Sequence, residues 1–318
     1  MEPIIEPVDA SLIEAELTQE HFLRHTNKGN NDIYIVNAFN SPNTMREIGR
    51  LREIAFRSAG GGTGLACDID EFDTMDKPCQ QLIVWSPDEK IILGGYRFLL
   101  GEDMERDADG VPNIAISHMF KYSPRFLREQ LPVTLELGRS FVRIEYQSTR
   151  AGVKAIFVLD NLWDGLGALT VVYPQIKYLL GKVTMYPHYS RECRDLLLTF
   201  LSVHFPDRDN LLKPIEPLKL TYPPEHFANL IQGQDFKEDY KRVNEFIRDQ
   251  GFNIPPLVNA YMSLSPTMRM FGTAVNHEFG EVEESGILFK IEEITDEKKG
   301  RHIKTFDTEC CRCHIQMV

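Results

Sequence analysis

The stretch that decides the fold is the run Val133-Thr-Leu-Glu-Leu-Gly-Arg-Ser-Phe-Val-Arg-Ile-Glu-Tyr146, the longest well-patterned strand candidate in the chain. Its β-favouring residues alternate with other types until the alternation slips near Gly138. A glycine inside a strand pattern indicates a bulge or a close approach of the backbone. Glu136 and Arg139 lie on either side of this expected kink. We therefore expect a bent central strand that directs two charged side chains into one cleft.

Length and charge limit the class of protein. A chain of 318 residues is long enough to bury a core as one large or two smaller domains. The net charge of −12 argues against broad nucleic-acid binding, which needs a basic face. Apolar runs fall short of the roughly 20 residues of a membrane helix, and the N-terminus lacks the features of a signal peptide. We expect a cytoplasmic protein, and peripheral contact with the inner membrane face stays open.

The cysteines predict no bound group. Six cysteines in a chain of this length do not form a disulfide framework. Three of them lie in the tail Cys310-Cys311-Arg312-Cys313-His314, which matches the C-x-x-C-H form of haem attachment and also offers zinc ligands. Haem is attached outside the cytoplasm, and little chain follows Cys313 to wrap a cofactor. We therefore favour an unconstrained reduced tail, with no metal and no bound cofactor.

The remaining patterns predict helices and strands in an α/β or α+β order. Helices are expected after Ser41, over 155–173, from Ser190 to Val203 and from Asp235 to Gly251, and a short one ends at Leu264. Strands are expected at 33–39, 81–85, 91–99, 114–120, 178–185, 268–275 and 286–293, the second and third of them forming a hairpin. We expect one mixed central sheet flanked by helices, with a core over 1–206. Residues 207–318 would be a C-terminal elaboration of helices and strands packed on that core, with a disordered or loosely held tail from about residue 300.

Two loop segments invite functional readings. Gly60-Gly-Gly-Thr-Gly64 lacks the Gly-Lys-Ser/Thr ending of a phosphate cradle, so a mobile loop or lid is expected. Asp68-Ile-Asp-Glu-Phe-Asp-Thr-Met-Asp76 is typical of a solvated loop and only occasionally of an ion site.

His204 and Asp209 form an H-x4-D pattern of the kind that glycerolipid acyltransferases use, which we interpret as a coincidence at a helix end.

Four motifs then occur in an order that resembles a known family. They are Arg52-x-x-x-Phe56, Asp70-Glu-Phe-Asp73, Gly94-Gly-Tyr-Arg97 and Leu135-Glu-Leu-Gly-Arg-Ser140. The order resembles the acyl-homoserine-lactone synthases, and it is closer to the ornithine-lipid type N-acyltransferases, a branch often labelled haemolysin-like. The downstream motifs Leu162-Trp-Asp-Gly-Leu166, Tyr178-Leu-Leu-Gly-Lys-Val and Pro255-Pro-Leu-x-x-x-Tyr261 are also similar.

This resemblance implies a GNAT-like fold and an N-acyltransferase. A fatty acyl group would pass from the phosphopantetheine thioester of acyl carrier protein to the α-amine of an amino acid such as glycine or ornithine, giving N-acyl amino acid lipids. The loop Gln147–Val153 is a poor version of the pyrophosphate cradle of CoA-using relatives. That departure fits a carrier-protein donor, although acyl-CoA stays possible.

The resemblance also implies roles for individual residues. Glu136 would accept the proton of the acceptor's ammonium, and Arg139 or Arg97 would hold its carboxylate. The other expected substrate-binding residues are Arg52, Phe56, Asp70, Asp73, Ser140 and Trp163. Asp70 and Asp73 would either bind an ammonium group or pin the lid to the arginines. Arg143, Arg150 and Lys154 would dock the acidic carrier protein. Two rival readings stay open: an autoinducer synthase that uses S-adenosylmethionine, and a non-catalytic fatty-acyl binding protein on the same scaffold.

Overall fold

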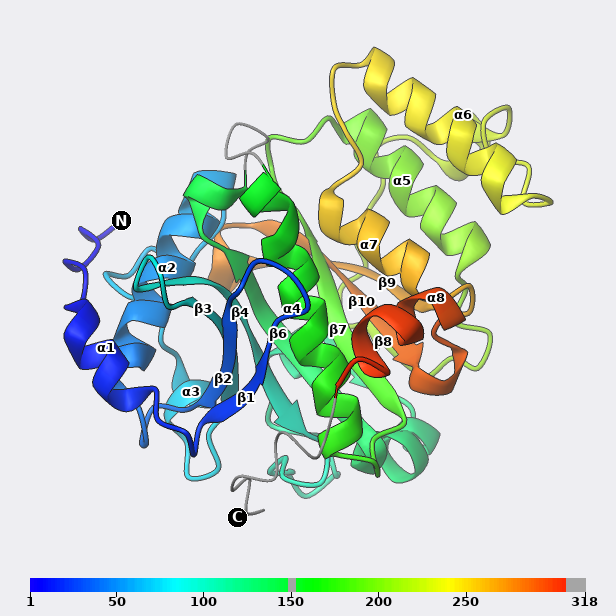
Figure 1. Cartoon of the computed structure of the whole chain (residues 1–318). Helices are drawn as coiled ribbons and strands as arrows, with labels where there is room; N and C mark the ends of the chain where they lie inside the picture. The colour runs from blue at the N-terminus through cyan, green and yellow to red at the C-terminus, as the bar shows by residue number, and fades with distance from the viewer. Residues whose placement is uncertain (148–152, 307–318) are drawn as a thin grey trace. The chain divides into compact units, whose positions relative to one another are not determined.

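The computed structural model describes residues 1–147 and 153–306, and of residues 153–156 only the backbone (Figure 1). By its internal contacts the chain divides into two compact units. The first comprises Met1–Met104, Leu135–Lys177 and the segment from Asp296 onward, and the second comprises Glu105–Thr134 and Tyr178–Thr295. The boundary expected at residue 206 therefore falls within the second unit. None of the helices in the described residues is long and apolar enough to cross a membrane.

Among its described residues, the first unit contains five neighbouring strands and several helices. The strands, in spatial order, are β1 (Phe22–His25), β2 (Asp32–Val36), β3 (Gln80–Ser86), β4 (Ile91–Leu100) and β6 (Thr134–Val142), each antiparallel to the next. The helices are α1 (Ala10–Glu16), α2 (Pro42–Ala59), α3 (Glu71–Thr74), α4 (Val153–Val172) and α8 (Asp296–Lys298). Short 3-10 or π turns cover Ile144–Tyr146 and Lys299–Ile303. The expected hairpin and the helix over 155–173 are confirmed, whereas β1 was not predicted.

The second unit has three neighbouring strands, a two-stranded sheet and three α-helices. Its strands run in the order β7 (Tyr178–Met185), β10 (Val282–Lys290) and β9 (Arg269–Asn276), and β5 (Phe120–Tyr122) pairs with β8 (Leu212–Pro214). The helices are α5 (Arg191–His204), α6 (Phe236–Asp249) and α7 (Pro256–Leu264). Short 3-10 or π turns cover Ala115–His118, Phe126–Gln130, Leu131–Val133, Pro224–Phe227, His277–Phe279 and Ile291–Glu293. The strand expected at 114–120 is wrong, because most of that run is the first of these turns.

In the first unit, α2 and α4 pack on opposite faces of β3. Gly165 of α4 lies against Leu82, since a Cβ built on this glycine would come within 2.7 Å of the leucine side chain. The neighbouring residue Gln81 instead bonds to Arg52 of α2. Successive side chains of a strand point to opposite faces, so the two helices sandwich the strand. The polar contacts of Arg52 therefore belong to the α2 face of the sheet.

The start of α2 differs in detail from the expectation. Pro42 opens the helix as predicted, but the Ser41 side chain makes no capping hydrogen bond. The carboxylate of Glu16 instead accepts the backbone N–H groups of Asn43 and Thr44, at 2.9 and 2.7 Å. Burial opposes ionisation of Glu16, yet these bonds outweigh it and lower its pKa. A distant carboxylate thus replaces the local cap, which sequence spacing does not reveal.

The bend of the central strand is confirmed. Arg97 of β4 pairs with Gly138 of β6, and Gly95 pairs with Phe141, so β6 carries one extra residue between these pairs. Arg139 lies in this bulge with a φ of 45°, a left-handed conformation that non-glycine residues rarely adopt. A bulge re-aims the side chains that flank it. It provides the local reason why charged residues of β6 meet the α2 face of the sheet.

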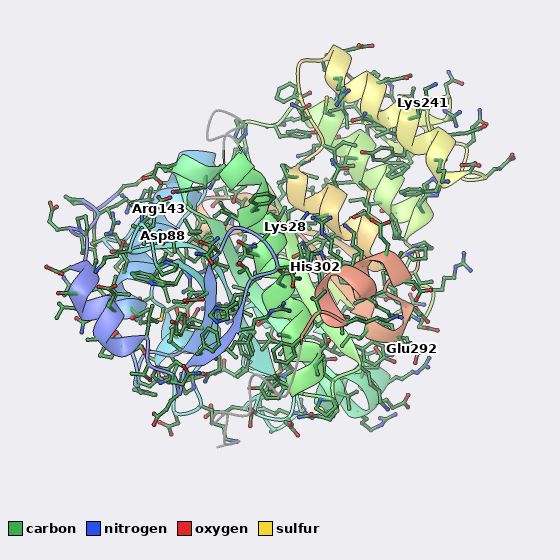
Figure 2. The ribbon with its side chains drawn as sticks, in the orientation of Figure 1. Lys28, Asp88, Arg143, Lys241, Glu292 and His302 are labelled. Atoms are coloured by element: carbon green, nitrogen blue, oxygen red, sulfur yellow. The ribbon has the colours of Figure 1, made fainter. Side chains whose placement is uncertain are left out.

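The C-terminal segment corrects another expectation. Residues 300–306, expected to be loosely held, instead continue the packed first unit. His302 is 4% exposed, and its Nδ1 lies 2.8 Å from a carboxylate oxygen of Asp164 in α4 (Figure 2). The side chain of Asn27 bonds both to that carboxylate, at 2.7 Å, and to the backbone oxygen of Arg301, at 2.9 Å. The cysteine-rich tail of residues 310–314 lies outside the described residues.

Candidate active site

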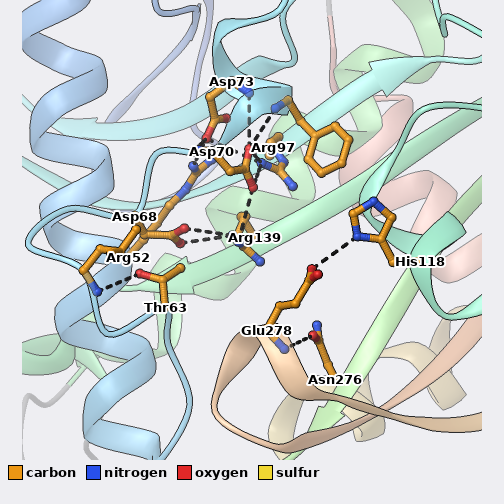
Figure 3. A network of polar contacts seen from close by, with 12 residues as sticks. Arg52, Thr63, Asp68, Asp70, Asp73, Arg97, His118, Arg139, Asn276 and Glu278 are labelled. Carbon is orange, nitrogen blue, oxygen red and sulfur yellow. Dashed lines mark hydrogen bonds and ion pairs between the residues drawn. The ribbon is translucent and has the colours of Figure 1, made fainter. Parts of the chain in front are cut away.

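Arginines from three elements converge on the acidic segment 68–73 (Figure 3). Arg97 of β4 donates through Nη1 to both carboxylate oxygens of Asp70, at 2.6 and 2.7 Å. Arg139 of β6 reaches the same carboxylate through Nη2 at 3.2 Å, and its Nε lies 3.0 Å from Asp68. Asp70 therefore links β4 to the bulge of β6.

A helix cap fixes the position of Asp70. Its carboxylate accepts the backbone N–H groups of Phe72 and Asp73, at 3.1 and 3.3 Å, and Asp73 accepts the N–H of Asp70 in return. This reciprocal capping box opens α3. Burial would raise the pKa of Asp70, but Arg97 and Arg139 outweigh it and lower that pKa to about 2. The carboxylate stays ionised at neutral pH and holds both guanidinium groups in place.

Asp73 belongs to a second, fully buried part of the network. It forms an ion pair with Arg52 of α2 at 3.1 Å, and both side chains have 0% exposure. Gln81 of β3 donates to Asp73 at 2.9 Å and accepts a hydrogen bond from Arg52. Asp73 also lies 3.4 Å from Arg97. Gln81 was not among the expected site residues, because nothing in its sequence neighbourhood marks a partner on another element.

The acidic segment is only partly the solvated loop that its composition predicts, because Glu71 and Asp76 are exposed whereas Asp68 and Asp73 are buried. Asp68 is 0% exposed, and burial raises its pKa above the ordinary range despite the opposing pull of Arg139. The described residues contain no group of three or more His, Cys, Asp or Glu arranged to hold a metal ion. The segment instead supplies the carboxylates that organise the arginines.

Glu136 lies on the same face of the sheet, close to Arg97. It is 3% exposed, and it stands two residues before Gly138, the strand partner of Arg97. A Cβ built on Gly138 would lie 3.5 Å from an oxygen of Glu136 and 3.7 Å from Nε of Arg97. The Cys79 thiol, which interacts electrostatically with both Arg97 and Glu136, is buried too, and burial raises the pKa of that thiol to about 12. The expected acid and one expected arginine thus meet beside a glycine.

The two arginines expected to hold a substrate carboxylate differ in the exposed fraction of their side chains. The side chain of Arg97 is 2% exposed and that of Arg139 is 13% exposed. Both guanidinium groups already pair with carboxylates of the chain, so each is positioned before any substrate arrives. Arg139 is the more accessible of the two, whereas Arg97 keeps an Nε that makes no hydrogen bond to any residue that the structure describes.

The other expected site residues are dispersed. Phe56 is buried on α2, and Ser140 is half-buried in the bulge. Trp163 is half-buried on α4, the helix that covers the other face of β3. The structure therefore does not gather it with the charged cluster. Of the expected docking residues, Arg143 is paired with Glu145 at 3.2 Å (Figure 2). Arg150 and the side chain of Lys154 lie outside the described residues.

The glycine-rich loop 60–64 is anchored, which corrects the expectation of a mobile lid. Glu53 of α2 accepts the backbone N–H of Thr63 at 3.1 Å and that of Gly64 at 2.8 Å, and it also pairs with Arg57. Burial works against ionisation of Glu53, but these contacts prevail and lower its pKa. The loop is fixed by a helix residue that precedes it in the sequence.

The H-x4-D pattern has no structural basis as a catalytic pair. His204 Nε2 lies 2.9 Å from Asp239 of α6, and Asp209 pairs with Arg269 instead. Asp239 also accepts the backbone N–H of Gly233 at 2.7 Å. His204 therefore joins two helices of the second unit, which supports the interpretation of the pattern as a coincidence.

The fold and comparison with known proteins define the class. A family model of the acetyltransferase (GNAT) domain matches residues 51–155, which contain every charged residue of the cluster just described. The chain is accordingly an acyltransferase with the GNAT-like fold expected from its motifs.

The family follows from two curated relatives. A glycine N(alpha)-acyltransferase of Bacteroides thetaiotaomicron is 63% identical over 306 residues, which are 96% of this chain and 91% of that protein. A protein of the same name from Phocaeicola vulgatus is 58% identical over 96% of this chain and 94% of its own length. The chain belongs to the family of these glycine Nα-acyltransferases.

Two solved structures resemble the fold more distantly. One is FeeM, an N-acyl amino acid synthase from uncultured soil microbes, with a TM-score of 0.40 and 10% identity over 84% of this chain and 94% of FeeM. The other is the AHL synthase LasI, with a TM-score of 0.32 and 15% identity over 49% of this chain and 74% of LasI. Likeness at this level supports no conclusion about substrates.

Proposed function

We propose that this chain transfers a fatty acyl group from the thioester of an acyl carrier protein to the α-amine of glycine, giving an N-acyl amino acid. Both curated relatives carry the name glycine N(alpha)-acyltransferase, at 63% and 58% identity. The structural observation that supports the proposal most is the buried carboxylate of Glu136, on the sheet face where Arg97 and Arg139 meet the acidic segment.

The reaction needs a base more than it needs a nucleophile from the protein. An amino acid carries an ammonium group at neutral pH, and only the neutral amine attacks a thioester. In the proposed step Glu136 takes the proton, the nitrogen bonds to the thioester carbonyl carbon, and the carbon–sulfur bond breaks. The attacking nitrogen then gives up a second proton, which the departing sulfur takes up as it leaves as the thiol of the carrier, and the product is the amide. General base catalysis of this kind typically contributes a factor of about 100 to 10,000.

The arginines suit the other end of the acceptor. Arg139 is the more accessible guanidinium, and Asp68 and Asp70 hold it at 3.0 and 3.2 Å. A guanidinium fixed in this way binds a carboxylate with little loss of conformational entropy. In the proposed complex Arg139 holds the carboxylate of glycine, with Nε of Arg97 as a second donor. The acceptor would thus be held at both of its charged ends.

Acyl carrier protein is proposed as the acyl donor because of a short basic segment that follows the central strand. Arg143, Arg150 and Lys154 follow the central strand within twelve residues, although the whole chain has a net charge of −12. A local basic surface would attract an acidic carrier protein and guide its encounter. Acyl-CoA is the alternative donor, and it offers an adenosine diphosphate group for the same cations.

The proposal is tested with the purified protein and an acyl carrier protein loaded with a fatty acid. Glycine, ornithine and S-adenosylmethionine are supplied in separate reactions, and the products are identified by mass spectrometry. We expect N-acylglycine. A lactone formed from S-adenosylmethionine would support an autoinducer synthase instead, and fatty-acid binding without any product would support the non-catalytic alternative. A parallel reaction with acyl-CoA distinguishes the two donors.

A further inference from the structure

Gly138 is a glycine that the backbone does not require. It lies within β6, pairs with Arg97, and is not among the glycines with positive φ. The positive φ of this bulge falls on the next residue, Arg139, at 45°. Glycine inside a strand weakens it, and it often marks a bulge or the close approach of a ligand or another chain segment. The bulge alone does not explain Gly138, because its left-handed position is occupied by Arg139. The absence of a side chain at residue 138 therefore calls for a reason in its surroundings.

Those surroundings differ from those of the glycines on the neighbouring strand. A Cβ built on Gly94 or Gly95 would come within 2.6 or 2.9 Å of a backbone oxygen, so packing excludes any side chain there. A Cβ on Gly138 would meet only the charged groups of two side chains. These are Oε1 of Glu136 at 3.5 Å, Oε2 of Glu136 at 4.0 Å and Nε of Arg97 at 3.7 Å. These are ordinary contact distances, so a methyl group fits at residue 138 without displacing the backbone.

We propose that Gly138 is a specificity-determining residue, whose missing side chain leaves room for the acceptor amino acid between Glu136 and Arg97. This inference rests on the proposed function and adds the size limit of the acceptor. The ammonium of an amino acid would lie against the carboxylate of Glu136. Its carboxylate would lie against Nε of Arg97, a buried donor that bonds to no described residue. An amino acid with no side chain, or a very small one, is the class of substrate that fits.

The position predicts a selective effect of substitution. In Gly138→Ala the new methyl group occupies the contact surface of both charged groups, so acceptor binding weakens while the thioester donor is unaffected. We expect the KM for glycine to rise about tenfold, equivalent to about 1.4 kcal/mol. The KM for the acyl carrier protein should change less than twofold. The preference for glycine over alanine in kcat/KM should also increase, because the larger acceptor loses more room. Gly138→Val should extend both trends.

The experiment measures initial rates with glycine, alanine and acyl carrier protein varied in turn, for the parent protein, both variants and Gly300→Ala. The last is a matched control, since a Cβ at Gly300 meets nothing within 4 Å. Thermal melting checks that each variant is folded, and Gly138→Ser replaces valine if Gly138→Val does not fold. A parent that acylates no amino acid refutes the proposed function itself. An active parent whose Gly138→Ala variant keeps its glycine KM, or raises only the donor KM, overturns the role of Gly138.

Discussion

Substitution of Asp70 by asparagine removes a charge from the centre of the site while keeping its shape. Asparagine caps a helix about as well as aspartate, so the start of α3 is preserved. What is lost is the ion pairing with Arg97 and Arg139, at 2.6 and 3.2 Å. Because the pKa of Asp70 falls from its ordinary value of 3.8 to about 2, these contacts favour the ionised form in the folded protein. At about 1.36 kcal/mol for each pKa unit, Asp70→Asn should cost about 2.5 kcal/mol of folding free energy.

The cost should depend on pH in a defined direction. A carboxyl group whose pKa is lower in the folded state stabilises the protein above its unfolded pKa, and it loses this effect as pH falls through the folded value. The difference between parent and variant should therefore be complete at pH 7 and should shrink between about pH 3.8 and pH 2.

Urea unfolding at pH 7 and at a series of acidic pH values measures this difference. Asp235→Asn is the matched control, because Asp235 also caps a helix but is exposed and pairs with no arginine in the described structure. It should cost little at any pH. A penalty for Asp70→Asn that does not depend on pH, or an equal penalty in the control, would refute the assignment of Asp70 as the charge that holds both arginines.

Two further perturbations test other parts of the molecule. Arg150→Glu should weaken binding of acyl carrier protein at low salt and much less at high salt, because salt screens charge interactions. Calorimetric titration at the two salt concentrations measures this difference. An effect that does not depend on salt would place the docking surface elsewhere. Gly167→Ala should destabilise the fold by about 1–3 kcal/mol, because its Cβ would come within 2.3 Å of the backbone oxygen of His302. Gly300→Ala should be neutral in the same denaturation assay, and equal costs would argue against the close approach.

Periodicity was sufficient to predict the elements that have long, regular patterns. The hairpin of β3 and β4, the helix α4 and the bend of β6 all follow from apolar spacing and one glycine. The strand predicted at 114–120 is wrong because a few consecutive apolar residues do not distinguish a strand from a 3-10 turn. The four-residue strand β1 was missed for a similar reason, since its pairing with β2 defines it more than its own sequence does.

The organisation of the site was only partly predictable. The motifs named the arginines and acids, but the partners of Asp68 and Gln81 lie 71 and 29 residues away along the chain. Contacts at such separations leave no trace in local patterns. The same holds for Glu53, which anchors a glycine-rich loop whose composition alone predicts mobility. These residues are buried in contacts that their local sequence does not predict, because burial depends on the whole fold.

The most direct test of the account concerns Glu136 as the base on the bent strand. Single-turnover acyl transfer to glycine is measured for the parent, for Glu136→Gln and for Glu102→Gln, a control in which an exposed carboxylate bonds only to Gln175 among the contacts described. We expect Glu136→Gln to slow transfer about 100-fold while its affinity for the acyl donor is unchanged, as for loss of a general base, and the control to match the parent. An unchanged rate in Glu136→Gln would contradict the mechanism.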